Sequence, residues 1–212
     1  MEGNNYGRQI WDFNDANMLI EEFMELYDTR PIKNNNYGMS STHLFWTWYV
    51  VKKLQPDNII ESGVWKGQGT WLFRQTLPKV NLYCIDPILE NREYIDEYAT
   101  YFKEDFSLID WSVYLNNGKT LCFFDDHQNA YMRLQQMKWM GLRHAMFEDN
   151  YPIKQGDCYS LKKVFAETGF QNSGRVIIPP NEAHSHYAKE NIERCRLYVN
   201  CKEQGGETYG MI

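Results

Sequence analysis

NIIESGVWKGQGT, residues 58–70, is the stretch that decides the predicted fold. Its first four residues are typical of a short buried strand, and Glu61 is followed by glycines two, six and eight residues later: Gly63, Gly67 and Gly69. Glycine lets the backbone turn sharply and come close to a ligand, because no Cβ stands in the way. A helix predicted over 70–76 would place its N-terminus at this turn, as in dinucleotide-binding folds.

Strands and helices alternate on both sides of this stretch. Strands are predicted at 58–61, 81–85, 120–124 and 144–147, and helices at 15–27, 43–54, 70–76, 90–98 and 129–141. Such alternation is typical of a mostly parallel sheet with helices on both faces, so we expect a Rossmann-like, doubly wound α/β fold. Ligands in these sheets bind outside the carboxyl ends of the strands.

The chain has 212 residues, which fits one domain. We expect an N-terminal helical segment (1–56), a cofactor and metal core (57–150) and a C-terminal part (151–212). That last part has predicted helices at 161–167 and 187–196 and a candidate strand at 175–178. Loops are expected at 150–157 and 171–180.

Charge and hydropathy narrow the class of protein. The net charge is −6 and the pI is near 5.4, which argues against a nucleic-acid partner because such binding depends on Lys and Arg. No stretch approaches the roughly 20 apolar residues that span a bilayer, and residues 1–10 are too polar for a signal peptide. We therefore expect a cytoplasmic protein without membrane partners, and the sequence leaves room for a homo-oligomer.

The cysteines suggest a reducing compartment. There are five, an odd number, and Cys84 and Cys122 lie in apolar runs that look like buried strands, so free thiols are predicted. Cys195 and Cys201 are the only close pair, and a metal or redox role for them is an alternative.

The glycine turn resembles the first motif of class I S-adenosylmethionine-dependent methyltransferases, acid-x-Gly-x-x-x-Gly. In that family the loop wraps the methionine part of the cofactor, and an acid at the end of the next strand holds the ribose hydroxyls. Asp86 occupies that position here, and the resemblance covers residues 58–86. It implies that the cofactor is bound by Glu61, Gly63, Gly67, Gly69 and Asp86.

Other interpretations of this region stay open. The glycines would also serve simply to end a strand, with Asp86 capping a turn before Pro87. A nicotinamide cofactor would use the same Asp86, although the carboxylate of Glu61 repels a pyrophosphate and suits a cationic ligand. Asp105 and Phe106 are candidates for contacts with the adenine, and Asp105 is equally suited to cap the turn into 107–111.

Acids follow the last two strands of the predicted core. Strand 120–124 runs into Asp125, Asp126 and His127, and strand 144–147 runs into Glu148 and Asp149. In a parallel sheet these carboxylates project from the same edge as the glycine turn. Since like charges at this spacing repel, a hard divalent ion such as Mg²⁺ is the predicted occupant.

This arrangement resembles the metal-dependent macrocin O-methyltransferases and their relatives named after cephalosporin hydroxylase. The resemblance implies metal ligands at Glu148, at Asp149 and at Asp125 or, as an alternative, Asp126. His127 is a candidate general base. The competing interpretation makes these acids solvated loop residues or caps of the helix near Asn129, with or without a metal-free methyl transfer.

The sequence thus predicts an S-adenosylmethionine-dependent, divalent-metal-assisted O-methyltransferase that acts on a small hydroxylated substrate, a sugar or a catechol-like ring. One alternative is a Rossmann-like protein that binds the cofactor without turnover. Another is a different enzyme on the same scaffold, since fold does not fix chemistry. Glu182, His184 and His186 form a further short polar cluster that would need other ligands to hold a metal.

Overall fold

The computed structural model describes residues 12–152, 155–165, 170–172 and 176–178. The chain forms two compact units, and the boundary between them falls between Asp125 and Asp126. Each unit is described by itself, and the predicted division into three segments of one domain stays a prediction.

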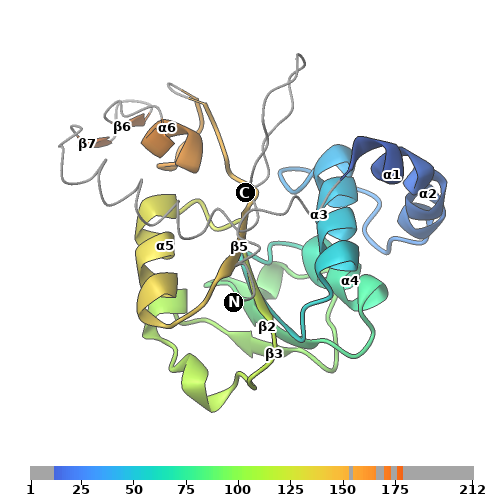
Figure 1. Cartoon of the computed structure of the whole chain (residues 1–212), viewed down its shortest axis with the longest axis horizontal. Coiled ribbons are helices and arrows are strands. Elements are labelled where there is room, and N and C mark those ends of the chain that lie inside the picture. Colours follow the sequence, from blue (N-terminus) through green and yellow to red (C-terminus); the bar gives the residue numbers. More distant parts are fainter. Residues whose placement is uncertain (1–11, 153–154, 166–169, 173–175, 179–212) are drawn as a thin grey trace, which may run out of the picture. The chain divides into compact units, whose positions relative to one another are not determined.

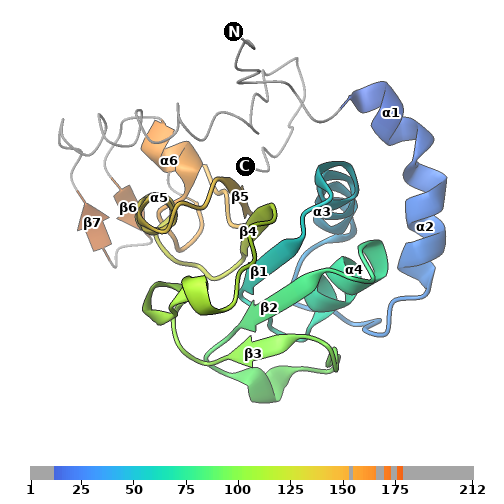
Figure 2. The same cartoon turned by 60° about the horizontal axis from the view of Figure 1, so that its bottom comes forward.

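The first unit is built on a parallel sheet. Its strands are β1 (Asn58–Ser62), β2 (Asn81–Ile85), β3 (Thr100–Phe102) and β4 (Thr120–Phe124), which lie in the order β3-β2-β1-β4 (Figure 2). The order reverses direction beside β1, where α/β folds of this kind open a ligand crevice at the carboxyl ends of the strands. The predicted Rossmann-like parallel α/β class is confirmed.

Different elements cover the two faces of this sheet. On one face, α4 (Gln68–Thr76) packs on the sheet and against α3 (Ser41–Leu54) (Figure 1). Phe73 of α4 meets Phe123 of β4 edge-on, with 5.2 Å between the ring centroids. On the other face, two 3-10 turns, η2 (Phe106–Leu108) and η3 (Trp111–Val113), supply the rings that pack on Tyr83 and Phe124. Both faces are therefore buried, as a parallel sheet requires.

The helices before β1 follow the sequence closely. The helix predicted at 15–27 is divided into α1 (Phe13–Met18) and α2 (Ile20–Asp28), which meet at Leu19. Asp12 caps α1, and Phe23 of α2 packs on rings of α3.

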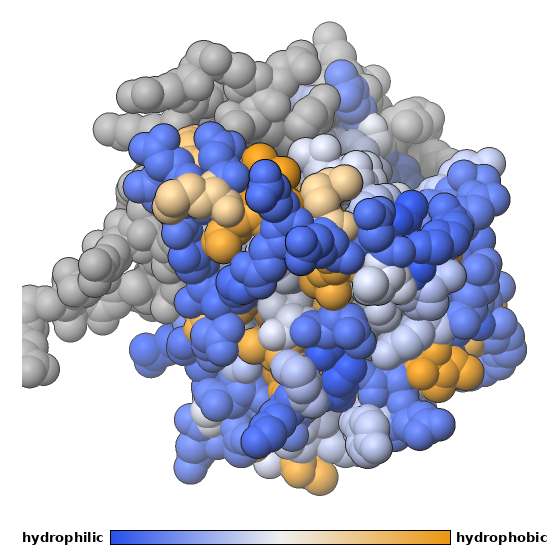
Figure 3. Space-filling model, turned by 90° about the vertical axis from the view of Figure 1, so that its right-hand side faces the viewer, coloured by the Kyte–Doolittle hydropathy of each residue, from blue (hydrophilic) through white to orange (hydrophobic). Residues whose placement is uncertain are grey.

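On the face shown in Figure 3, hydrophilic residues dominate and hydrophobic residues form separate small spots.

The prediction of a helix at 90–98 is wrong. Only the 3-10 turn η1 (Leu89–Asn91) forms there. The backbone N–H groups of Glu93 and Tyr94 donate to the carbonyl of Lys66, so this stretch pairs with the glycine turn and not with itself. Strand β3 was not predicted, because three residues carry too little pattern.

The second unit contains α5 (Ala130–Trp139), β5 (His144–Phe147), α6 (Leu161–Phe165) and an antiparallel pair, β6 (Phe170–Asn172) and β7 (Val176–Ile178). Strand β7 confirms the candidate strand at 175–178, whereas β6 lies partly where a loop was expected. The predicted helix 187–196 and residues Glu182, His184, His186, Cys195 and Cys201 lie outside the described residues.

Two further expectations can be checked in the described part of the chain. Cys84, Cys122 and Cys158 are buried free thiols, as predicted for the first two. Among the described helices, none has the length and apolar character that crossing a membrane requires.

Candidate functional site

The glycine turn after β1 needs its glycines for backbone reasons. Gly63 and Gly67 have φ values of 97° and 92°, a region that side chains with a Cβ rarely adopt. Gly67 is also crowded, since a Cβ there would lie 2.5 Å from the carbonyl oxygen of Tyr94. Trp65 lies between them at a φ of 48°, so the turn is tightly constrained over its whole length.

Asp86 clamps this turn from the end of β2. Its Oδ2 accepts hydrogen bonds from the backbone N–H groups of Val64 (3.0 Å) and Trp65 (2.9 Å), and its Oδ1 accepts one from Ile88 (2.8 Å). The last bond is the turn cap that was the alternative interpretation of this residue. Asp86 is thus both a cap and a clamp, and its carboxylate lies at the predicted cofactor turn.

Glu61 is the buried acid of the site, with a side chain that is 1% exposed. Its Oε2 accepts hydrogen bonds from the hydroxyl of Thr70 (2.5 Å) and the thiol of Cys84 (3.3 Å). Burial raises the pKa of Glu61 to about 8, against the opposing effect of the Thr70 hydrogen bond. Gly69 leaves room for this carboxyl group, because a Cβ there would lie 2.3 Å from Oε1.

The chain at 34–39 borders the turn, a feature that no sequence signal indicated. Trp65 donates from its indole nitrogen to the carbonyl of Asn36 (3.1 Å), and Lys66 donates from Nζ to the carbonyl of Asn34 (2.9 Å). Lys66 also forms an ion pair of 2.6 Å with Glu93. Both side chains therefore hold the 34–39 segment against the glycine turn.

Asp105 and Phe106 have structural contacts. Asp105 accepts hydrogen bonds from the backbone N–H (2.9 Å) and the hydroxyl (2.6 Å) of Ser107, so it caps η2. The ring of Phe106 is fully buried against Phe124 and Trp111. The capping alternative for Asp105 is confirmed, and contact of either residue with an adenine stays a prediction.

In the second unit, His127 lies between two acids. Its backbone N–H donates to Oδ2 of Asp149 at 3.1 Å, and its ring Nδ1 lies 2.9 Å from Oδ1 of Asp157 and 3.7 Å from Oδ2 of Asp149. His127 has a φ of 52°, a conformation that these contacts hold in place. Asp157 was not predicted, because 30 residues of chain separate it from His127.

The pKa values of this group depend on one another. Burial raises the pKa of Asp149 to about 6, while the charge of His127 opposes the shift and that of Glu148 adds to it. Burial lowers the pKa of His127, but the acids Asp149 and Asp157 outweigh it and the net shift is upward. Neighbouring titratable groups whose pKa values are shifted by burial and by one another are typical of functional sites.

Asp126 is held by an arginine. Its Oδ2 accepts from Nε (3.0 Å) and Nη2 (2.8 Å) of Arg133, a buried residue of α5, and its Oδ1 accepts from the N–H of Gln128. Helix α5 is capped by Asn129, so neither Asp125 nor Asp126 is its cap. The role of helix cap, offered as an alternative for these acids, is wrong.

The remaining predicted ligands are Asp125 and Glu148. Asp125 follows β4 as the last residue of the first unit, and its backbone N–H donates to the carbonyl of Ser62 (2.8 Å) at the end of β1. Glu148 follows β5 and is half-buried, and its charge contributes to the raised pKa of Asp149.

Fold and turn together define a Rossmann-like α/β unit with an acid-led glycine turn. No family model and no curated protein matches the chain. Several solved protein structures do resemble the chain. A methyltransferase of Podospora anserina, PaMTH1, bound to S-adenosylhomocysteine (SAH), has 11% sequence identity and a TM-score of 0.47 over 86% of this chain and 76% of that one.

Two further structures resemble the chain at similar levels. One, titled cmcI-N160 SAH, has 18% identity and a TM-score of 0.43 over 57% of this chain and 68% of that one. The other is cofactor-bound Rv0187 from MTB, with 12% identity and a TM-score of 0.42 over 85% and 81% of the two chains. At these identities and TM-scores the likeness by itself assigns no activity to this chain.

Proposed function

We propose that the chain is an S-adenosylmethionine-dependent methyltransferase whose cofactor binds at the glycine turn of residues 61–70. The observation that carries the proposal is Glu61. It is buried, its hydrogen-bond donors are the hydroxyl and backbone of Thr70 and the thiol of Cys84, and no Lys, Arg or His of the described residues pairs with it. A cationic ligand would favour the ionised form of this carboxyl group.

The charge of the turn favours this cofactor over a dinucleotide. Glu61 and Asp86 place two carboxyl groups at one turn, and the charge of Asp86 raises the pKa of Glu61. A pyrophosphate would add negative charge to this region, whereas a sulfonium or ammonium group would offset it. The alternative of a nicotinamide cofactor is therefore disfavoured.

The residues after β4 and β5 would provide the proton chemistry. S-Adenosylmethionine, when bound, supplies a methyl group that is open to attack by an oxygen nucleophile. Asp157 accepts from Nδ1 of His127 when that nitrogen carries the proton, which leaves Nε2 as the acceptor for a proton from a substrate hydroxyl. Asp149 holds the backbone of His127 in position for this task.

We also propose that a divalent cation assists the transfer. Asp149 and Glu148 supply carboxylate oxygens. Asp125 precedes His127 by two residues, so chain connectivity keeps the Cα atoms of Asp125 and His127 within about 7 Å of each other. Oxygen ligands of this kind suit Mg²⁺. Asp126 is the less suitable of the two neighbouring aspartates, because Arg133 already neutralises it.

The proposal also includes a substrate class and a location. A small hydroxylated acceptor, such as a sugar or a catechol-like ring, fits a base that takes a hydroxyl proton. The net charge of −6 is unfavourable for a polyanionic acceptor. A cytoplasmic location agrees with the buried free thiols.

A transfer assay tests the proposal. The protein is incubated with methyl-labelled S-adenosylmethionine and panels of sugars and catechols, with Mg²⁺ or with EDTA, and labelled product is measured. We expect product with Mg²⁺, little with EDTA, and loss of turnover with Asp149→Ala. Equal turnover in Mg²⁺ and in EDTA would contradict the proposed role of the metal. Cofactor binding without any product would favour the alternative of a protein that binds the cofactor but does not transfer the methyl group.

A further inference from the structure

Lys163, in α6, is a buried lysine that the proposed chemistry does not use. It is 2% exposed, and its Nζ donates to the carbonyl of Cys158 at 2.6 Å. Lysines are almost never buried to this degree, because removing the ammonium group from water is costly unless a partner receives it. A buried ammonium group that binds a loop carbonyl therefore indicates that the position of this loop is important.

Cys158 connects this contact to Asp149. Its thiol donates to the carbonyl of Asp149 at 3.3 Å, and Oδ2 of Asp149 accepts from the backbone N–H of His127 at 3.1 Å. Cys158 is buried, and burial raises the pKa of its thiol to about 12, so the thiol keeps its proton and remains a donor. The ammonium group of Lys163 is thus connected to the backbone of His127 through two residues.

Asp157, the residue before Cys158, holds the ring of the same histidine. Its Oδ1 lies 2.9 Å from Nδ1 of His127. Burial raises the pKa of Asp157, but the hydrogen bond and the charge of His127 outweigh it, and the charge of Lys163 adds to the net lowering. Because Asp157 and Cys158 are consecutive, one ammonium group anchors both contacts that hold His127.

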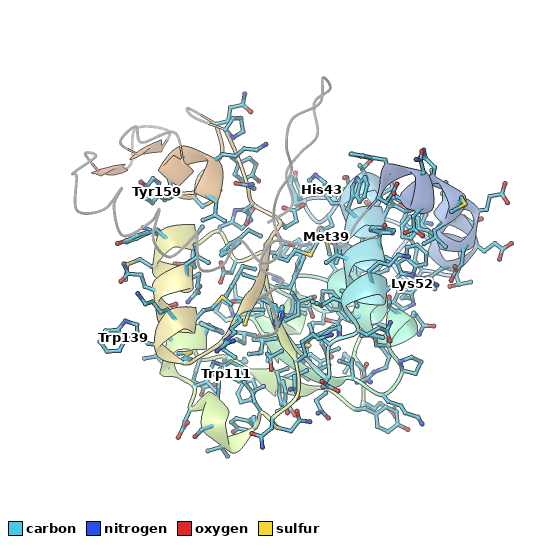
Figure 4. The ribbon with its side chains drawn as sticks, viewed as in Figure 1. Met39, His43, Lys52, Trp111, Trp139 and Tyr159 are labelled. Atoms are coloured by element: carbon cyan, nitrogen blue, oxygen red, sulfur yellow. The ribbon has the colours of Figure 1, made fainter. Side chains whose placement is uncertain are left out.

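The other end of this loop is fixed by separate bonds. Tyr159 lies between α5 and α6 (Figure 4), and its carbonyl accepts from the backbone N–H of Ala130 (3.0 Å) at the start of α5. The hydroxyl of Ser160 donates to the carbonyl of Tyr151. Lys163 acts at the end of the loop that carries the partners of His127, so its contribution can be tested apart from these bonds.

We propose that Lys163 is a positioning residue for His127. Through the carbonyl of Cys158 it keeps Asp157 against Nδ1 of the imidazole, so that the neutral ring carries its proton on Nδ1 and has an unprotonated Nε2. The inference rests on the proposed function, in which Nε2 takes the proton from a substrate hydroxyl.

NMR of the protein with isotope-labelled histidine tests the inference, without cofactor or acceptor. The spectra report which nitrogen of the neutral imidazole carries the proton, and His127→Gln identifies the signals of His127. The variant is Lys163→Met, which keeps the length of the side chain and removes the ammonium group. Its matched control is Lys162→Met, the same change at the preceding, half-buried position of the same helix.

In the wild type and in Lys162→Met we expect the proton mainly on Nδ1. In Lys163→Met the ratio of the Nδ1-protonated to the Nε2-protonated form should fall about tenfold, as expected when a hydrogen bond to a charged group is lost. Circular dichroism establishes that the variants are folded. If Lys163→Met does not fold, Lys163→Gln, which is shorter and uncharged, takes its place with the same expectation. A wild-type ratio in the folded variant would overturn the inference.

The transfer assay supplies a second measurement. We expect Lys163→Met to lower kcat about tenfold or more and to leave KM for S-adenosylmethionine unchanged, because the proposed cofactor turn belongs to the first unit. An unchanged kcat, or an equal effect of Lys162→Met, would contradict the role of Lys163. Failure of the proposed function has a different signature: the wild type forms no product, whereas the change in the imidazole of Lys163→Met is still observed.

Discussion

Glu61, near the end of β1, accepts a hydrogen bond of 2.5 Å from the hydroxyl of Thr70 in α4. The bond ties the acid that leads the glycine turn to the helix that follows the turn. It also shows how a carboxyl group is accommodated at 1% exposure without a cation among the described residues.

Replacing Glu61 by Gln should flatten the dependence of stability on pH. The pKa of Glu61 is raised from 4.5 to about 8 by burial, so the folded state holds a proton that the unfolded state releases. The free energy of unfolding of the wild type should therefore fall by a few kcal/mol between pH 4.5 and 8 and level off above pH 8. Urea unfolding at several pH values measures this. Equal slopes in wild type and Glu61→Gln would contradict the assignment.

Gly69→Ala should destabilise the fold although alanine is the better helix former. The added Cβ would lie 2.3 Å from Oε1 of Glu61, so the carboxyl group must shift. We expect a loss of about 1–3 kcal/mol, the usual cost of overpacking, against a small effect for Gln75→Ala on the exposed side of α4. Chemical denaturation of both variants makes the comparison, and a more stable Gly69→Ala would show that the space beside Glu61 is not limiting.

Variants of Asp125 and Asp126 should have opposite effects on the stability of the fold and on metal binding. Asp126→Asn breaks the pair with buried Arg133 and should cost about 3 kcal/mol of stability while sparing Mg²⁺ affinity. Asp125→Asn should do the reverse. Denaturation and Mg²⁺ titration of both variants test this, and a loss of Mg²⁺ binding in stable Asp126→Asn protein would exchange the two roles.

Asp157→Asn should lower the pKa of His127. Burial depresses this pKa, and the neighbouring acids Asp149 and Asp157 outweigh that effect. Removal of one acid therefore shifts the imidazole titration to lower pH, which NMR of the ring protons detects. If His127 is the general base, the acid limb of the pH–rate profile moves in the same direction. An unmoved titration would show that the 2.9 Å contact has no electrostatic role in solution.

Sequence alone predicted the parts of the fold that depend on local pattern. Strands β1 and β2, the glycine turn and Asp86 are signalled by residues within 30 positions of one another, and β4 is signalled by its own apolar run. The helix expected at 90–98 failed because tertiary pairing of Glu93 and Tyr94 with Lys66 replaced helical hydrogen bonds. Propensity gives way when the backbone finds partners elsewhere.

The candidate site was predicted less completely than the fold. The acids after β4 and β5 were predictable from strand ends, but the pairing of Asp126 with Arg133 was not, because a buried arginine on α5 has no sequence signature. Contacts of Asn36 and Asp157 join segments about 30 residues apart and depend on packing.

The most direct test of the central claim is calorimetric titration of the protein with SAH, for the wild type and for Asp86→Ala. Asp86 holds the glycine turn through the N–H groups of Val64 and Trp65, so its loss should disorder the turn and remove the ribose contact that the family resemblance implies. We predict micromolar binding by the wild type and at least a tenfold loss in the variant. No binding by the wild type, with or without Mg²⁺, would contradict the assignment of this turn to S-adenosylmethionine.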